Sequence, residues 1–204
     1  VIALTVRDGD ELLDAVMTNG QSEILLAGRH GRCCRFDESD ARALGRTASG
    51  VRGINIDDDD EVIGMIAYDP TAEDAQAHSL LVVSEHGYGK RSDFDEYRKT
   101  SRGGKGVKTL NITEKTGELV AMKNVTDEND LMIINRSGLT IRMAVADIKV
   151  AGRATQGVRL INIKEGDSIA AISAVNKTEE DVPQQPVEGA AEDQASEPQN
   201  QINE

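Results

Sequence analysis

Short apolar runs separated by polar turns recur along the chain and predict strands rather than helices. Compact apolar runs, each followed by a glycine-centred turn and a further run, stand at 23–28, 79–84 and 130–135. Runs rich in β-forming residues stand at 12–18, 62–68, 119–125 and 169–175. Runs of this length with turn residues between them are typical of antiparallel hairpins. Because helical periodicity is weak throughout, the pattern predicts an all-β fold.

Three ungapped segments repeat one order of residues, and they are 31–56, 87–112 and 138–163. Each begins with glycine and carries two arginines at fixed positions. Each closes on Gly-Val-basic followed by Ile-Asn-Ile or Leu-Asn-Ile, and we predict that this closing segment forms a strand. Residues 1–6 match the end of a further copy. Repeats of this length indicate propellers or similar arrays. We therefore predict radially arranged blades of about four strands each, with repeats at about 7–56, 57–112 and 113–175.

The C-terminal segment differs in composition from the rest. Residues 177–204 hold eight acidic residues, one lysine and three of the four prolines, with almost no large apolar side chains. Such a segment cannot bury enough surface to fold, so we predict a disordered acidic tail after a folded part at 1–176. The chain also lacks an initiator methionine, and we interpret it as part of a longer protein with further blades upstream.

Composition argues against several other functions. No apolar run is long enough to span a membrane, and the N-terminus has no signal-peptide pattern. Cys33 and Cys34 are adjacent and fit a reducing compartment, without a metal-ligand spacing to the histidines. Aromatic residues make up 2% of the chain and Trp is absent, which argues against stacking platforms for single-stranded nucleic acid.

Basic residues gather at one part of each repeat, although the whole chain has a net charge of −13. The windows 35–52, 91–108 and 142–159 hold 14 of the 23 Lys and Arg residues. In a radial fold, equivalent positions of successive blades lie on one rim, so these residues are expected to form a basic belt. Such a belt suits the phosphates of a bent duplex, whose contacts release counterions and need no base-specific reading.

The residues that we predict to contact DNA occupy three shared positions and one glycine-rich loop. The shared positions are Arg35, Arg91 and Arg142, then Arg46, Arg102 and Arg153, then Arg52, Lys108 and Arg159. Lys90 precedes one of these arginines, and the loop adds Gly103, Gly104, Lys105 and Gly106, whose backbone N–H groups can surround a phosphate. The alternative is that the arginines are solvated groups whose stems pack on the sheet.

Three further patterns have more than one interpretation. The acidic run 57–61 fits a calcium site or a solvated turn, and the turn is favoured because the other repeats have ordinary turn sequences there. Residues 146–150 fit either a helical turn or a strand. Tyr88 and Tyr97 have no activating pattern around them, and no catalytic triad or P-loop is present, so we predict no catalytic residue and no metal site.

Six stretches in this order carry a family resemblance: "DGDELLDAV", "GVRGI", "HGYGKR", "EYRKTSRGGKGV", "INRSGLTIRM" and "VAGRATQGVRLI". Together they resemble the C-terminal DNA-wrapping domain of the A subunit of bacterial DNA gyrase over residues 1–176, and the acidic tail is also similar. That family fold is a six-bladed β-pinwheel whose blades exchange strands, so the resemblance implies its last three blades. Residues 100–106 match five of the seven positions of the family box Gln-Arg-Arg-Gly-Gly-Lys-Gly and resemble a degenerate copy.

The resemblance also implies a parent function. It points to a cytoplasmic, nucleoid-associated type II topoisomerase that introduces negative supercoils, with ATP and Mg²⁺ used by the holoenzyme and no cofactor in this part. The implied partners are double-stranded DNA, the rest of the gyrase A subunit, and the gyrase B subunit in an A2B2 heterotetramer. The alternatives are the matching domain of the topoisomerase IV A subunit, against which the regular repeats argue, and a protein-binding propeller with no nucleic-acid role.

Overall fold

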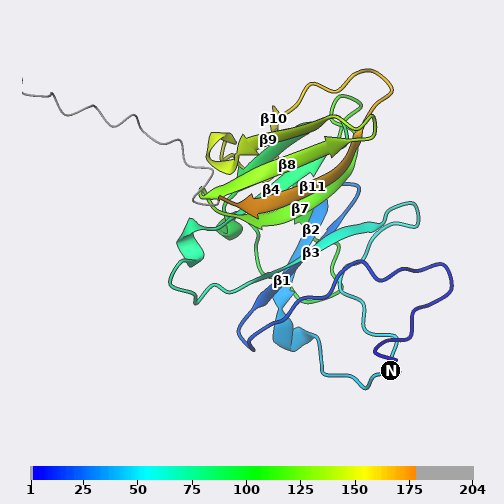
Figure 1. Ribbon diagram of the computed structural model, residues 1–204. Coiled ribbons are helices and arrows are strands. Elements are labelled where there is room, and N and C mark those ends of the chain that lie inside the picture. Colours follow the sequence, from blue (N-terminus) through cyan, green and yellow to red (C-terminus); the bar gives the residue numbers. More distant parts are fainter. Residues whose placement is uncertain (1, 178–204) are drawn as a thin grey trace, which may run out of the picture.

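A computed structural model describes residues 2–177, and this part of the chain contains strands and short 3-10 turns without an α-helix (Figure 1). The strands are β1 (Glu23–Gly28), β2 (Arg32–Asp37), β3 (Val62–Tyr68), β4 (Ser79–Ser84), β5 (Tyr88–Ser92), β6 (Val107–Lys108), β7 (Leu119–Val125), β8 (Asn129–Asn135), β9 (Thr140–Ala144), β10 (Val158–Arg159) and β11 (Ile169–Asn176). The turns are η1 (Glu38–Asp40), η2 (Ala75–Ala77), η3 (Phe94–Glu96) and η4 (Val145–Asp147). The all-β prediction is confirmed. The predicted tail, apart from Lys177, lies outside the described residues.

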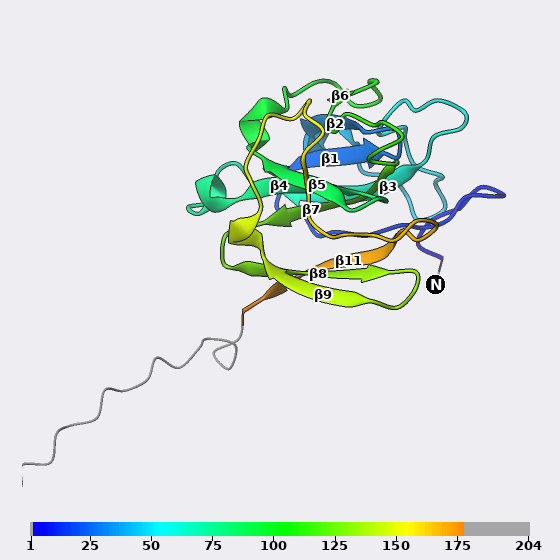
Figure 2. The same cartoon turned by 90° about the horizontal axis from the view of Figure 1, so that it is seen from above.

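Each sheet is built around one antiparallel hairpin. The hairpins are β1–β2, β4–β5 and β8–β9. The next long strand after each hairpin pairs with the first strand of that hairpin, so that β3 pairs with β1, β7 with β4, and β11 with β8. These added strands adjoin one another, since β3 packs beside β7 and β7 beside β11. The three sheets therefore follow one another across the molecule in chain order (Figure 2).

The two-residue strands β6 and β10 belong to one repeat in sequence and to the preceding sheet in space. β6 pairs with β2, and β10 pairs with β5, both antiparallel. The first two sheets thereby have the orders β3-β1-β2-β6 and β10-β5-β4-β7. The third sheet, β11-β8-β9, has three strands within the described residues. The strand exchange that the family resemblance implies is present.

Two predictions of strands are wrong. Residues 12–18 form no strand, although the equivalent runs are β3, β7 and β11. Each of those strands pairs with a hairpin that precedes it, and no hairpin precedes residue 12 in this chain. The Ile-Asn-Ile segments are likewise not strands, because pairing ends at the two residues of β6 and β10. Val51 and Arg52, which are equivalent to those two strands, lie in none.

The two ambiguous segments have clear conformations. Residues 57–61 form a turn, in which a carboxylate oxygen of Asp60 accepts hydrogen bonds from the backbone N–H groups of His30 at 3.0 Å and Glu61 at 2.9 Å. Residues 146–150 begin in η4, and Val150 then forms a parallel bridge with Arg91. The segment is therefore a helical turn that leads into a single bridge.

Burial on both faces explains why such short strands suffice. All six side chains of β4 are buried. Leu80 and Val82 pack into the apolar cluster shared with the first sheet, whereas Leu81 and Val83 pack into the cluster shared with the third. Because side chains alternate across a strand, a middle blade must be apolar on both sides. Each such side chain contributes about 1.5–3 kcal/mol on full burial.

The repeated glycine before each exchanged strand allows a close approach between blades. Gly106 has φ +68°, and a Cβ there would lie 2.4 Å from the carbonyl oxygen of Cys33. Gly157 has φ +77°, and a Cβ there would lie 2.5 Å from the carbonyl oxygen of Gly89. A left-handed residue without a side chain is therefore required at the point where one repeat meets the sheet of the preceding one.

Candidate nucleic-acid interface

The first shared arginine ties one blade to the next. Arg35 is 8% exposed and pairs with the carboxylate of Glu23. Its Nη1 also donates to the backbone carbonyl oxygens of Phe94 and Tyr97, the latter at 3.0 Å. Both carbonyls belong to the η3 turn and its C-cap in the next repeat. The guanidinium thus joins a carboxylate of its own sheet to a turn of the neighbouring blade.

Arg91 repeats this arrangement one blade further along. It is 6% exposed, pairs with Asp127, and donates from Nε to the carbonyl oxygen of Ile148 at 3.0 Å. Ile148 caps η4, just as Tyr97 caps η3. The same position of the repeat therefore does the same structural work in two successive blades.

In the second repeat, the carboxylate that pairs with this arginine comes from a different position of the repeat. In the third repeat, Nε of Arg142 donates to Asp130 at 2.7 Å, and Asp130 is equivalent to Glu23 of the first. The second repeat has Ser79 at this position, and its buried Oγ has no hydrogen-bond partner within the described part of the chain. Asp127, from the turn before β8, supplies the carboxylate instead.

The second and third shared positions lie at the seams between blades. Nη1 of Arg102 donates to the backbone carbonyl oxygen of Arg52, and Nη1 of Arg153 donates to that of Lys108 at 2.8 Å. The second basic residue of one repeat thus contacts the third basic residue of the preceding repeat. Six residues form this basic seam: Arg46, Arg52, Arg102, Lys108, Arg153 and Arg159.

The third position keeps its charge uncompensated. In every repeat, its side chain is exposed and donates to the asparagine three residues later, which is neutral. These contacts are Arg52 to Asn55 at 3.3 Å, Lys108 to Asn111 at 3.2 Å, and Arg159 to Asn162 at 3.2 Å. In residues 2–177, no seam residue has a carboxylate within ion-pair distance. The seam therefore presents positive charge to solvent.

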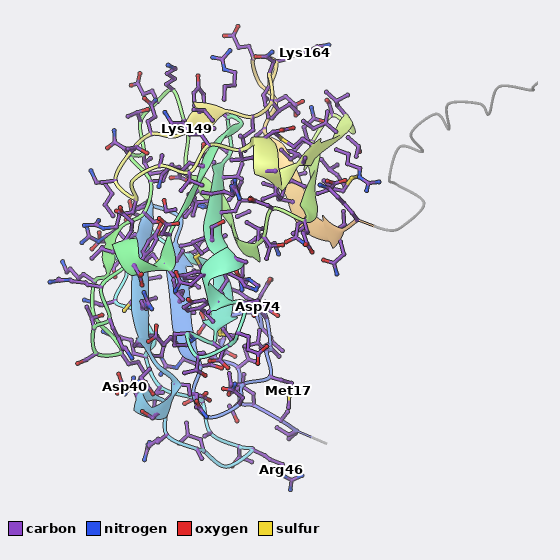
Figure 3. The ribbon with its side chains drawn as sticks, turned by 90° about the vertical axis from the view of Figure 1, so that its left-hand side faces the viewer. Met17, Asp40, Arg46, Asp74, Lys149 and Lys164 are labelled. Atoms are coloured by element: carbon purple, nitrogen blue, oxygen red, sulfur yellow. The ribbon has the colours of Figure 1, made fainter. Side chains whose placement is uncertain are left out.

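The seam runs along the molecule. Arg46 is exposed and has no hydrogen-bond or ion-pair partner among the described residues. Figure 3 shows it projecting outward at one end of the molecule, with Lys149 and Lys164 at the opposite end. Cations that recur once in each repeat can meet phosphates at intervals along one duplex.

The glycine-rich loop closes a cleft beside the seam. Residues 100–106 line it together with Arg32 and Arg98, around a volume of about 520 Å³. Arg32 holds the loop, because Nε donates to the carbonyl oxygen of Lys105 and Nη2 to that of Gly106, both at 2.9 Å. The exposed side chains of Arg98 and Lys105 have no carboxylate partner within the described part of the chain.

The backbone of this loop is available in part for an anion. The N–H of Gly103 donates to the carbonyl oxygen of Gly53 at 2.7 Å, so it is not available. The N–H groups of Gly104, Lys105 and Gly106 have no acceptor in the described part of the chain. Three consecutive donors therefore remain beside two exposed cations, an arrangement that suits a phosphate oxygen.

Three predicted contacts are corrected by burial. Arg35 and Arg91 are committed to carboxylates and turn carbonyls, so we leave them out of the candidate interface. Lys90 is fully buried, and its Nζ donates to Oγ of Ser92 at 2.9 Å and to the carbonyl oxygen of Arg153 at 2.8 Å. Burial lowers the pKa of Lys90 to about 8. Its place is beneath the seam, where it holds the backbone of Arg153.

Two cleft residues are missing from the sequence prediction. Arg32 stands where the other repeats have Tyr88 and Leu139, so comparison of the repeats gave no signal for it. Arg98 does have basic equivalents, Arg42 and Lys149, which were a signal that the prediction left unused. Only the pairing of β2 with β6, which sets Arg32 opposite Lys108, brings Arg32 to the seam.

No helix in 2–177 has the length and apolarity to cross a bilayer. Over the same range, no three His, Cys, Asp or Glu side chains are placed to hold a metal ion together. Cys33 and Cys34 are free and buried.

Sheets that take up strands from the next repeat, with cations along the seams, define a β-propeller type of domain with a basic surface. The chain matches the family described as DNA gyrase C-terminal domain, beta-propeller, over residues 22–69, 78–126 and 129–176, and it belongs to that family. The DNA gyrase A subunit of Staphylococcus aureus (strain NCTC 8325 / PS 47) is 44% identical over 180 residues, and that of Staphylococcus epidermidis (strain ATCC 12228 / FDA PCI 1200) is 43% identical over 179. Each match covers 88% of this chain and 20% of the relative, so the chain spans a fifth of their length.

Solved structures of the same fold agree with this assignment. A DNA gyrase A C-terminal domain superposes with a TM-score of 0.75 at 21% identity, covering 85% of this chain and 57% of that one. The C-terminal domain of a DNA topoisomerase IV superposes with a TM-score of 0.77 at 21% identity, covering 85% and 53%. At this identity the two structures show the fold alone. The family resemblance predicted from the sequence is confirmed by the family match and the relatives.

The buried ion pair and hydrogen bonds of Arg35 predict a large loss of stability for Arg35→Ala. Removing the guanidinium leaves the Glu23 carboxylate buried and the Tyr97 carbonyl without a donor among the described residues. Lys99 still reaches Glu23 at 2.7 Å, and the Tyr97 N–H still donates to the Phe94 carbonyl at 3.0 Å. We expect the free energy of unfolding in urea to fall by about 3 kcal/mol. Arg46→Ala, which removes an exposed and unpartnered arginine, should change it by less than about 0.5 kcal/mol. Equal stability of the two variants would show that Arg35 is not a tie.

The buried lysine predicts a stability difference that depends on pH. The folded pKa of Lys90 is about 8, below its ordinary 10.5, so between these values the unfolded chain binds more protons than the folded one. The free energy of unfolding should therefore rise as pH increases from 8 to 10.5 in the wild type, relative to Lys90→Met. Urea unfolding of both proteins across this pH range measures the difference. Both proteins have the same tyrosines, so the contribution of those tyrosines cancels in the comparison. A difference that stays constant with pH contradicts a buried, charged Lys90.

Proposed function

We propose that this chain is the DNA-binding and DNA-wrapping part of a DNA gyrase A subunit. The observation that carries this proposal is the basic seam, whose cations recur at each junction between blades and have no carboxylate partners within the described residues. Duplex DNA presents phosphates at short, regular intervals, and their neutralisation by Lys and Arg releases counterions. The seam offers the matching row of charges.

Sequence-independent binding follows from the same geometry. The described part of the chain has no α-helix to enter a major groove, and all of its Phe and Tyr residues are buried. Phosphate contacts from side chains and loop N–H groups fix a duplex in place without reading its bases. Bending a duplex costs a few kcal/mol over a few tens of base pairs, and many contacts along a curved row of blades can offset that cost.

The proposal extends to the parent enzyme. We propose that the whole protein is a bacterial, cytoplasmic type II topoisomerase that supercoils DNA negatively with ATP and Mg²⁺, used in parts other than this one. Its partners are then the remainder of the A subunit and the gyrase B subunit in an A2B2 assembly. Support comes from relatives at 44% identity that are A subunits of DNA gyrase, together with the gyrase family match. Catalytic residues are assigned to the other parts.

Topoisomerase IV is the second candidate, because a C-terminal domain of that enzyme superposes as well as the gyrase domain. Both structures are 21% identical to this chain, so structural likeness does not separate them. The sequence relatives do, since those at 43–44% identity over 88% of the chain are gyrase subunits. We therefore favour gyrase.

Titration of duplex DNA over a range of salt concentrations tests the function. Affinity should fall linearly in a plot of log K against log salt concentration, with a slope of about −0.9 for each phosphate contacted. Arg46→Gln should weaken binding equally for two duplexes of unrelated sequence, and it should reduce the magnitude of the slope by about 0.9. Lys123→Gln is the matched control, because Lys123 is exposed on β7, away from the seam. Salt-insensitive binding, or a loss confined to one sequence, contradicts phosphate recognition.

A further inference from the structure

A second basic cavity adjoins the seam at Arg159. Its volume is about 340 Å³, and its lining is His86, Tyr88, Lys115, Arg159 and residues 163–167. Arg159 lies on the exchanged strand β10, which pairs with the start of β5 at Tyr88. Lys164, in the turn before β11, lies at the end of the molecule opposite Arg46 (Figure 3). The cavity is therefore continuous with the row of seam cations.

Three cations converge on this cavity, and neither of the carboxylates in its lining, Glu165 and Asp167, forms an ion pair with them within the described residues. Nζ of Lys115 and Cζ of Arg159 each lie 5.3 Å from the centroid of the Tyr88 ring, and Lys164 lines the same space. Within the described part of the chain, none of the three cations has a carboxylate at ion-pair distance. Like charges gathered in this way repel each other, so an anion would stabilise the group.

The two acidic residues of the lining are not paired with these cations. Glu165 forms no ion pair within the described part of the chain. Asp167 accepts hydrogen bonds from Nδ2 of Asn135 at 2.6 Å, Oγ of Ser137 at 2.8 Å and the N–H of Ser168 at 2.9 Å. The hydrogen bond from Ser137 is the largest cause of the lowered pKa of Asp167. Its carboxylate therefore serves to hold the β8–β9 turn.

The Tyr88 hydroxyl can donate a hydrogen bond into the cavity. Its oxygen accepts hydrogen bonds from Arg159, from Nε at 3.2 Å and from Nη2 at 2.7 Å, and these bonds lower the pKa of Tyr88. With its oxygen occupied in this way, the phenol proton must point to another group. In the described residues, no acceptor is placed for it. A polarised O–H among unpaired cations is suited to an anionic oxygen.

We propose that this cavity binds one phosphate group of the DNA backbone, with the Tyr88 hydroxyl as a neutral donor and Lys115 and Arg159 as the cations. The inference rests on the proposed function and deepens it. Continuity with the seam through Arg159 favours a backbone phosphate over free inorganic phosphate. The first blade offers a parallel, because Arg32, the equivalent of Tyr88, lines the cleft beside the glycine-rich loop.

Two substitutions test separately how the Tyr88 hydroxyl and the cations contribute to DNA affinity. Tyr88→Phe keeps the ring under Lys115 and Arg159 and removes the hydroxyl, with the two hydrogen bonds that it accepts from Arg159. The charges are unchanged, so duplex affinity should fall about 10-fold while the salt slope stays unchanged. Lys115→Gln should lower both the affinity and the magnitude of the slope, the latter by about 0.9. Lys123→Gln, again the control, should change neither. Thermal unfolding of each variant checks that the fold is retained.

The outcomes distinguish this site from the wider function. If the wild-type chain binds duplex DNA with salt dependence but Tyr88→Phe binds equally well, the cavity proposal fails and the seam proposal stands. If the wild-type chain binds no duplex, both fail. If inorganic phosphate raises the melting temperature of the wild type and not of Tyr88→Phe, while both bind DNA alike, the cavity is a free-phosphate site and the DNA assignment is overturned.

Discussion

The buried guanidinium that reaches from one blade into the turn of the next is the interaction on which the rest of the structure depends. Arg35 and Arg91 each hold a carboxylate and a 3-10 turn together across a blade junction. The exchanged strands β6 and β10 follow from the same junctions, and a left-handed glycine precedes each of them. The buried arginine and the exchanged strand recur at the same positions of successive repeats. Together they fix where the exposed seam cations lie.

The sequence predicted the strands of the sheets well and the roles of the arginines poorly. Strands such as 62–68 and 119–125 follow from local apolar pattern, which the sheets then use directly. Residues 12–18 have the same pattern but no partner hairpin, and pairing is not a local property. The arginines at 35 and 52 look alike in the repeat. They differ because the acceptors of Arg35 lie in another blade, at Phe94 and Tyr97, where no spacing along the chain reveals them.

Charge separation gives this acidic chain a basic surface of the kind that the proposed DNA binding requires. The buried arginines take carboxylates as partners, whereas the seam arginines rest on carbonyl and amide oxygens, which hold their geometry and leave their charge in place. The cavity beside Tyr88 belongs to the same scheme, yet Lys115 has Asp59 and Gly166 at its equivalent positions. A comparison of the repeats could therefore not have found it, and only the folded turn brings Lys115 over the ring.

The most direct test is chemical modification of arginine side chains, read residue by residue by mass spectrometry, with and without a saturating DNA duplex. The account predicts that Arg46, Arg52 and Arg159 react in the free chain and are protected by DNA. It predicts that Arg35 and Arg91 stay unmodified in both states. Reaction of the two buried arginines in the folded chain, or seam arginines that react equally with DNA bound, would contradict the division between ties and contacts.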